Sequence, residues 1–387
     1  MLLHTLRLVD YRNYQSASIE LSPGMTLVTG ANAQGKTNLL EGIYYLSIGK
    51  AYRQSRDEQI VRWGTHSFSI EAYAQSRQGN TKIQIQYNTK EKPAKQIFLD
   101  GLRRDTWEEC SGVFTSVLFS PESMSVIKGP PQERRSFLDH DISQVSQSYG
   151  VDLLRYRRLL AQRNTLLKSI GHQKGLPGQW KEKLTIWDEQ LIAYGSRIIN
   201  KRLGFLEKMT PMARLMQRKL TEGKENLELH YLHAEDKYLS PQLGKATTSG
   251  TKRDTEASLT LAREYALEDD LRYGSTQWGP HRDDVRILLD DTDVRQFGSQ
   301  GQQRTGVLAL KLAEIEVFRG ESGEYPILLL DDVLSELDEQ RQDQLLSIIN
   351  EKSIQCVITS TGDRTMDSLP NKQIKQLRVH QGEIREI

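Results

Sequence analysis

The sequence predicts an α/β fold that is interrupted by a mainly helical insertion. Strand-like and helical segments alternate along residues 1–125, whereas residues 131–218 show the apolar period of helices and few strand signals. Apolar strands return near the C-terminus, for example at residues 326–330. We therefore expect one discontinuous α/β body, formed by residues 1–125 and 265–387, and a helical domain formed by residues 126–264.

The composition is typical of a globular protein with a sizeable core. The chain has 387 residues, of which 37% are hydrophobic and 27% are charged. Charged residues occur too early for a signal peptide, and no apolar run approaches the roughly 20 residues that cross a bilayer. Cys110 and Cys356 are too few for a disulfide framework or a cysteine-based metal site. We therefore expect a cytoplasmic protein that does not bind membranes.

The N-terminal elements are strands and one helix. Apolar positions indicate strands at Leu3–Val9 and Met25–Thr29, and residues 37–48 have the helical period. Phe68–Ala74 and Lys82–Tyr87 alternate between apolar and polar residues, as antiparallel strands do.

A glycine-rich loop of the form G-x-x-x-x-G-K-[ST] joins the strand Met25–Thr29 to the helix at residues 37–48. In this context the motif binds the phosphates of a nucleotide. The glycines let backbone N–H groups turn towards the phosphates, and the helix N-terminus adds its positive dipole. We expect the lysine to reach the terminal phosphates and the threonine to bind Mg²⁺. The alternative is a glycine-rich turn that binds nothing. The loop residues are Gly30, Ala31, Asn32, Ala33, Gln34, Gly35, Lys36 and Thr37.

A second motif lies near the other end of the chain. Pro326–Leu330 is a continuous apolar run, typical of a buried parallel strand, and it ends in Asp331 and Asp332. Ligands bind at the carboxyl ends of such strands. We expect Asp331 to hold Mg²⁺, through Thr37 or a bound water, and Asp332 to orient or deprotonate the attacking water. Taken alone, the two carboxylates could equally cap a helix; the phosphate loop favours the functional interpretation.

A polar turn precedes the helix that leads to this strand. It contains Ser299, Gly301 and Gln302. Taken alone, the turn is best explained as a helix cap.

Together these motifs resemble those of ABC-type ATPase heads. The polar turn, the strand ending in two aspartates, and Ser335-x-Leu337-Asp338 are similar to the signature, Walker B and D-loop motifs of that class. The whole chain resembles the RecF family, whose heads are related to those of SMC proteins. The resemblance implies an ABC-type P-loop ATPase head with a mixed sheet, plus an inserted, mainly helical arm domain. Its more particular marks are Asp10–Tyr14, Gly49–Arg53, Phe119–Glu122, Gly279–Asp284 and Ser299–Thr305.

The resemblance also implies a mechanism. Two heads would pair with ATP and Mg²⁺ between them, the phosphate loop coming from one copy and Ser299, Gly301 and Gln302 from the other. Dimerisation would depend on ATP, and slow hydrolysis would act as a release switch. Arg12 matches an early arginine of the related heads and would contact the nucleotide; a solvated turn residue is nearly as good an interpretation.

Departures from the ABC pattern bear on this mechanism. Asp332 stands where the usual residue is glutamate, and its shorter side chain suits slow hydrolysis. The switch histidine of transporters is missing near residues 359–361, so we expect a threonine or serine to sense the terminal phosphate. Pro121-Glu122 stands about where a Q-loop glutamine is expected, and we assign it no ligand role.

The helical insertion carries an excess of positive charge. Residues 151–220 contain 15 Lys and Arg against 5 Asp and Glu, although the formal net charge of the chain is only +1. Affinity for duplex DNA comes largely from neutralising phosphates, so this segment is a candidate DNA-binding surface. Solvated helix faces explain the charge equally well. The basic residues considered are Arg155, Arg157, Arg158, Arg163, Lys181, Lys183, Lys201 and Arg202.

The function that the resemblance implies is ATP-dependent DNA binding in recombinational repair, replication restart and the SOS response to DNA damage. The protein would be a weak, DNA-stimulated ATPase that dimerises at single-stranded/double-stranded junctions or gaps and promotes RecA loading with RecO and RecR. A P-loop small-molecule kinase and a transporter ATPase subunit are the alternatives. The signature-like turn and the long separation of Lys36 from Asp331 argue against the kinase. The basic insertion and the missing histidine argue against the transporter.

Overall fold

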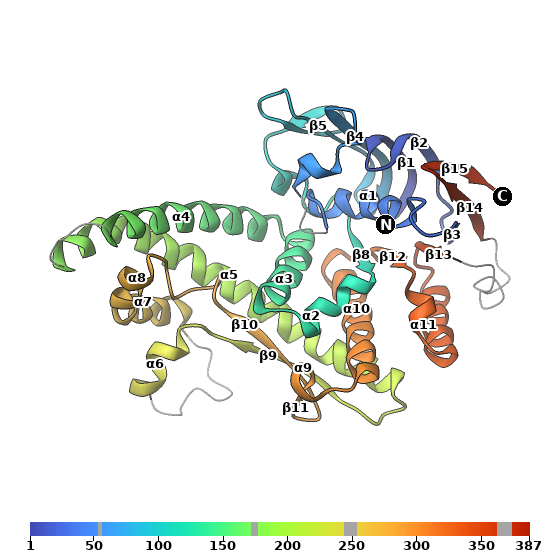
Figure 1. Ribbon diagram of the computed structural model, residues 1–387. Coiled ribbons are helices and arrows are strands. Elements are labelled where there is room, and N and C mark those ends of the chain that lie inside the picture. The colour runs from blue at the N-terminus through green and yellow to red at the C-terminus, as the bar shows by residue number, and fades with distance from the viewer. Residues whose placement is uncertain (53–55, 172–176, 244–253, 362–373) are drawn as a thin grey trace.

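The computed structural model describes residues 1–52, 56–171, 177–243, 254–361 and 374–387. Figure 1 shows a part that holds two large sheets and both chain ends, and an elongated part in which long helices reach away from the sheets.

Six strands form the sheet that carries the phosphate loop. Their spatial order is β15-β14-β3-β13-β12-β8, and neighbours pair in parallel except β14 with β15, which are antiparallel. The sheet is therefore mixed, and this expectation is confirmed. The strands are β3 (Met25–Thr29), β8 (Ser116–Phe119), β12 (Ile327–Asp331), β13 (Cys356–Ser360), β14 (Lys375–His380) and β15 (Glu383–Glu386).

A second sheet of six strands is antiparallel throughout, in the order β2-β1-β4-β5-β6-β7. It contains the alternating strands that the sequence predicts, each extended by a few residues. The strands are β1 (Leu2–Tyr11), β2 (Tyr14–Glu20), β4 (Ser67–Ser76), β5 (Gly79–Asn88), β6 (Lys95–Leu99) and β7 (Leu102–Arg104).

Helix α1 (Lys36–Ile48) lies between the two sheets, and 11 of its 13 residues are buried. One core joins α1 to Val28, Leu329 and Val357 of the mixed sheet and to strands of the antiparallel sheet. The opposite face of the mixed sheet packs against α10 (Gln300–Ser322) in a second core. Both faces of the central strands β3, β12 and β13 are covered, and every residue of these three strands is buried.

The insertion is helical, as predicted. Figure 1 shows α4 (Gln147–Gly171) and α5 (Pro177–Leu220) lying side by side and reaching away from the sheets, with α3 (Pro131–Val145) at their base. Pro211 lies inside α5. Although proline removes one backbone hydrogen bond, the buried side chains of Met209 and Ala213 hold the helix on both sides of it.

Smaller elements complete the structure. The helices are α2 (Ser125–Lys128), α6 (Asp236–Leu243), α7 (Thr255–Tyr265), α8 (Leu267–Tyr273), α9 (Val294–Phe297) and α11 (Glu339–Glu351). Short 3₁₀ turns lie at Asp57–Ile60, Trp107–Cys110, Pro121–Met124 and Val333–Glu336.

A third sheet bears on the domain division. Its strands are β9 (Leu227–Leu232), β10 (Asp284–Leu289) and β11 (Thr292–Asp293), and β10 pairs with β9 rather than with either large sheet. Residues 284–293 therefore share a sheet with residues from within the predicted arm. The boundary between residues 264 and 265 stays a proposal.

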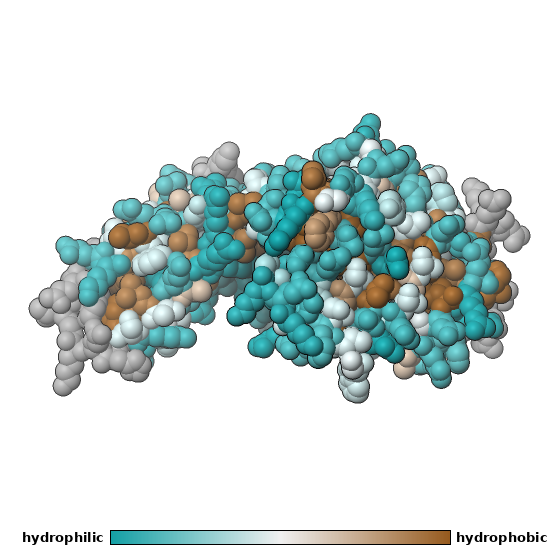
Figure 2. All heavy atoms as spheres, turned by 90° about the horizontal axis from the view of Figure 1, so that it is seen from above, coloured by the Kyte–Doolittle hydropathy of each residue, from teal (hydrophilic) through white to brown (hydrophobic). Residues whose placement is uncertain are grey.

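The face of the molecule seen from above is mainly polar. Figure 2 shows hydrophilic residues over most of the face seen from above, with hydrophobic residues in small, scattered groups. None of the described helices combines the length and the apolar character needed to cross a bilayer.

Candidate nucleotide-binding site

Two glycines shape the loop between β3 and α1. Gly30 has a φ of 154° and Gly35 a φ of 121°, values that side-chain-bearing residues rarely adopt. A Cβ atom on Gly30 would lie 2.4 Å from the carbonyl oxygen of Val379 on the adjacent strand β14. A Cβ atom on Gly35 would lie 2.5 Å from Asn13 Nδ2. The loop therefore requires glycine at both positions of the motif.

The turn between β1 and β2 supports this loop from the side. Asn13 Nδ2 donates to the Gln34 carbonyl at 2.8 Å, and the Tyr14 hydroxyl donates to the Gly35 carbonyl at 2.8 Å. Asn38 Nδ2, on α1, donates to Asn13 Oδ1 at 2.8 Å. No local sequence pattern points to this supporting role; the only signal is that Asn13 and Tyr14 belong to a motif of the family resemblance.

Arg12 lies in the same turn, but its contacts are with protein groups. Its guanidinium forms an ion pair with Glu41 of α1 at 2.8 Å, and its Nη1 donates to the Gln59 carbonyl at 3.2 Å. These contacts tie the turn to α1. A contact between Arg12 and nucleotide stays a prediction.

Lys36 is buried at the start of α1. Its Nζ donates to the carbonyl oxygens of Gly30 and Ala31, at 2.7 and 2.9 Å. Burial lowers the pKa of Lys36, and the carboxylates of Asp332 and Asp331 oppose this shift. The ammonium group therefore lies inside the loop that is predicted to hold phosphate groups, within electrostatic reach of Asp331 and Asp332.

Thr37 and Asp331 bring the two halves of the predicted site together. The Thr37 hydroxyl donates to Asp331 Oδ1 at 3.0 Å, although 294 positions separate the two residues. The Thr359 hydroxyl of β13 donates to the same oxygen at 2.8 Å. Two hydroxyl groups and a carboxylate are hard oxygen ligands of the kind that Mg²⁺ prefers.

Asp332 follows in a strained conformation. Its φ of 54° is in the left-handed region, which Asp tolerates better than most residues. The Asp332 N–H donates to Thr359 Oγ1 at 2.9 Å, and the Ser335 hydroxyl donates to the Asp332 carbonyl at 2.7 Å. These bonds hold the backbone of Asp332 in this conformation.

A hollow of about 280 Å³ lies between these groups. Thr361, close to the position where transporters have a histidine, is also at its wall. Ala31, Asn32 and Ala33 are exposed at the tip of the loop, and Gln34 Oε1 accepts a hydrogen bond of 2.7 Å from the backbone N–H of Gln381. The residues that line the hollow are Asn32, Ala33, Gly35, Lys36, Thr37, Asn38, Asp331, Asp332 and Thr361.

Glu122 lies close to this site. A smaller neighbouring hollow is lined by Glu122 together with Thr37 and Asp331. The adjacent Ser120 hydroxyl lies 3.3 Å from that of Tyr52. The position predicted for the Q-loop thus lies close to Thr37 and Asp331, the two residues expected to bind Mg²⁺. From the sequence there was no reason to expect a ligand role for Glu122.

The signature-like turn lies away from the hollow. Ser299 caps α10: its hydroxyl accepts from the Gln302 N–H at 3.2 Å, and Gln302 Oε1 accepts from the Ser299 N–H at 2.9 Å. Gln302 Nε2 also donates to Glu225 at 3.0 Å. Ser299 and Gly301 are exposed, and neither lines the hollow around Lys36. Within one chain, the structure does not bring the signature-like turn to the phosphate loop.

The basic insertion is less available than its charge suggests. Arg163 is wholly buried and pairs with Asp188 and Asp270, each at 2.7 Å. Arg202 is 2% exposed and pairs with Asp139 at 2.7 Å. Both arginines are core residues and are wrong as candidates for DNA contact.

The other basic candidates are on the outside or beyond the described side chains. Arg155, Arg157, Arg158, Lys183 and Lys201 are exposed, and Arg157 also pairs with Asp139. The side chain of Lys181 lies outside the described residues.

The comparisons with known proteins agree with one another. Residues 2–385 match the family described as RecF/RecN/SMC N terminal domain. The chain is 42% identical to the DNA replication and repair protein RecF of Natranaerobius thermophilus, over 93% of this chain and 91% of that one. It is 36% identical to the protein of the same name from Clostridium novyi, over 100% of both chains.

Solved structures show the same relationship. The structure of the recombination mediator protein RecF-ATP in the RecFOR pathway has a TM-score of 0.86 and 34% identity, covering 100% of this chain and 97% of that chain. The RecF-ATPrS structure has a TM-score of 0.87 and 33% identity, covering 100% and 98%. The Smc head domain from Pyrococcus furiosus, at a TM-score of 0.53 and 15% identity over 100% of this chain and 95% of that chain, shows a shared fold alone.

Proposed function

The chain belongs to the RecF family of DNA replication and repair proteins, and from that premise we propose that it is an ATP-switched DNA-binding protein of recombinational repair and replication restart. The observation that carries this proposal is the hydrogen bond between Thr37 and Asp331. It joins the residue that follows the buried Lys36 of a phosphate loop to an acidic strand end, as an ATPase requires.

The residues present fit ATP and Mg²⁺. Gly30 and Gly35 form a cradle that a Cβ atom would fill, and the Lys36 ammonium already bonds two oxygens inside it. Thr37 and Asp331 would hold Mg²⁺, which when bound would neutralise charge on the phosphate oxygens. Lys36 would bind the terminal phosphate groups.

The remaining catalytic role falls to Asp332. Asp332 lines the hollow, and its backbone is held by Thr359 and Ser335. In that place it would orient the attacking water and accept its proton. A single, short carboxylate of this kind supports slow hydrolysis that acts as a switch.

We assign the exposed turn around Ser299 to the site of a second copy. Its hydroxyl and backbone N–H groups stand at the start of α10, where the positive end of the helix dipole favours anionic groups. Because the turn lies outside its own hollow, it would complete the hollow of a partner. Dimerisation would then depend on ATP, since only the closed dimer would contact the terminal phosphate from both sides.

DNA would lie against the exposed basic residues of the arm and against the paired heads. Arg155, Arg158 and Lys201 are exposed on α4 and α5 and could neutralise phosphates without reading bases. Binding at gaps or at single-stranded/double-stranded junctions, stimulation of hydrolysis by DNA, and loading of RecA with RecO and RecR extend the proposal. We assign the protein to the cytoplasm, where these partners act.

A small-molecule kinase or a transporter ATPase is the competing class. Neither predicts that DNA stimulates hydrolysis or that ATP drives dimerisation on DNA. The test is sedimentation of the wild type and of Lys36→Arg, with and without ATP and gapped duplex. We expect dimers only for the wild type with ATP, and the largest species with DNA. An ATP-independent monomer in all samples would contradict the proposal.

A further inference from the structure

The motif Gly279–Asp284 is not part of the nucleotide site, although it is one of the marks of the family resemblance. It joins β10 to the helices of the arm. Arg134 of α3 pairs with Asp284 at 2.7 Å, Arg202 of α5 donates to the Pro280 carbonyl at 2.8 Å, and His281 Nδ1 lies 2.8 Å from the Tyr156 hydroxyl of α4. The motif therefore fastens the base of the arm.

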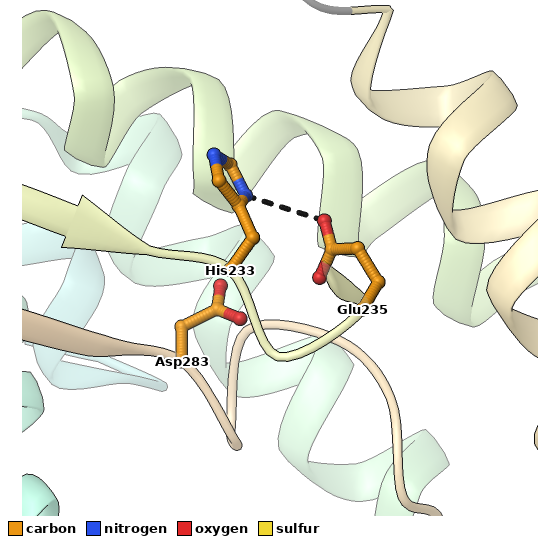
Figure 3. A group of neighbouring side chains, drawn as sticks. All are labelled: His233, Glu235 and Asp283. Atoms are coloured by element: carbon orange, nitrogen blue, oxygen red, sulfur yellow. Dashed lines mark ion pairs between the residues drawn. The ribbon is translucent and has the colours of Figure 1, made fainter. Parts of the chain in front are cut away.

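Asp283 of this motif faces two residues from the loop after β9. Figure 3 shows His233, Glu235 and Asp283 grouped together, with the His233 ring turned towards Glu235. One nitrogen of His233 and one oxygen of each carboxylate all lie within 4.8 Å of one another. Both carboxylic residues are wholly buried, and the His233 side chain is 12% exposed. The group is thus enclosed, with the imidazole on its solvent side.

The distances suit a bound metal ion. His233 Nδ1 lies 3.2 Å from Glu235 Oε1, and among the described residues this nitrogen has no hydrogen-bond partner. Two ligands of a tetrahedral Zn²⁺ ion, each about 2.1 Å from the metal, lie about 3.4 Å apart. The spacing of the two atoms is therefore close to that of ligands sharing one ion.

The surroundings orient the third ligand. The Ala234 N–H donates to Asp283 Oδ1 at 2.8 Å, and the Tyr231 hydroxyl donates to Asp283 Oδ2. Neither donor carries a charge. Donors of this kind fix the direction of a ligating carboxylate.

We propose that His233, Glu235 and Asp283 bind one first-row transition-metal ion, Zn²⁺ or Mn²⁺. One imidazole and two carboxylates suit these ions better than Mg²⁺, which prefers oxygen ligands alone. The ion would link the loop after β9 to the motif that fastens the arm. Its role is structural, and it is separate from the site around Lys36.

The test uses the full chain without nucleotide, freed of metal with a chelator and dialysed against Zn²⁺, Mn²⁺ or Mg²⁺ alone. We expect close to one equivalent of Zn²⁺ or Mn²⁺ by elemental analysis, and a rise of the unfolding temperature with these ions but not with Mg²⁺. Glu235→Gln and His233→Gln should lose the bound equivalent and the thermal shift.

Two controls separate this site from others. Glu228→Gln alters an exposed His–Glu pair, at 3.1 Å from His230 on the preceding strand, and should keep the bound ion. Asp331→Asn alters the nucleotide site and should keep it too. If either buried variant fails to fold, the absorption spectrum of Co²⁺ bound to the wild type reports whether an imidazole is a ligand. Absence of a bound equivalent in the wild type, or its retention in Glu235→Gln, would overturn the proposal.

Discussion

Thr359 and Asp331 lie beside each other in register on β13 and β12, and the Thr359 hydroxyl donates to Asp331 Oδ1 at 2.8 Å. The same hydroxyl accepts the N–H of Asp332 at 2.9 Å. One buried side chain thus positions both acidic residues of the site.

Replacing Thr359 by valine should disturb both. The shape of the side chain is kept, but the Asp332 N–H loses its acceptor, at a cost of about 1–3 kcal/mol. We expect lower stability in urea unfolding and weaker Mg²⁺-dependent ATP binding. Thr26→Val is the matched control, because Thr26 is also a buried strand threonine that accepts a backbone N–H, but outside the site. Equal effects of both substitutions on ATP binding would show that Thr359 has no special role.

Asp332→Asn and Asp331→Asn should differ in how long the protein stays on DNA. Asn also tolerates the left-handed conformation of residue 332, so Asp332→Asn should keep ATP and Mg²⁺ but slow hydrolysis. The dimer on DNA should then persist. Asp331→Asn should weaken Mg²⁺-dependent binding and give no closed dimer. DNA residence time in saturating ATP is the measurement; dissociation of Asp332→Asn as fast as the wild type would exclude hydrolysis as the release step.

Ser299→Arg should separate nucleotide binding from dimerisation. Because the serine lies outside its own hollow, ATP binding by the monomer should stay near normal while ATP-dependent dimers disappear. The substitution also removes a helix cap worth about 1 kcal/mol. Asp254→Ala controls for that loss, since Asp254 caps α7 by accepting from the Ala257 N–H at 3.0 Å. Loss of ATP binding by monomeric Ser299→Arg would argue against the trans arrangement.

Gly30→Ala should prevent the phosphate loop from forming. Its Cβ atom would meet the Val379 carbonyl oxygen at 2.4 Å, and its φ of 154° strains any side chain. We expect loss of ATP binding and a lower unfolding temperature. Gly204→Ala is the control, because its new Cβ would meet no described atom within 4 Å beyond the helix's own backbone, and α5 should gain up to about 1 kcal/mol. Normal ATP binding by Gly30→Ala would contradict the loop geometry.

The pH dependence of stability should report on His281. Burial is the main cause that lowers the pKa of His281, to about 3. Below about pH 6.5 the unfolded state binds a proton at His281, whereas the folded state leaves this imidazole neutral. The contribution of His281 to the free energy of unfolding is therefore fully present above that pH and is lost as the pH falls. Between pH 7.5 and 5.5 this one group should cost about 1.4 kcal/mol.

Urea unfolding at the two pH values tests this expectation. His281→Gln should lose less stability on acidification than the wild type does. His230→Gln, at an exposed position, should lose as much as the wild type. The pKa of His140 is also lowered by burial, so part of the decline should remain in His281→Gln. An unchanged decline in His281→Gln would show that His281 is not responsible.

Local patterns in the sequence were sufficient for the elements and for the chemistry of contiguous motifs. The apolar run before Asp331 is β12, residues 37–48 are helical, and the glycines of the phosphate loop occupy the conformations that glycine alone adopts readily. Periodicity and backbone preference act over a few residues, which is why a single sequence reveals them.

Contacts between distant segments were decided by the tertiary structure. No local pattern shows that Asn13 supports Gln34, or that the motif Gly279–Asp284 fastens the arm instead of serving the nucleotide site. Arg163 and Arg202 contribute to a basic count in the sequence, yet packing of the helices encloses them with aspartates. A charge count is a property of composition, whereas burial and pairing depend on which helix faces which, and only the packed chain determines that.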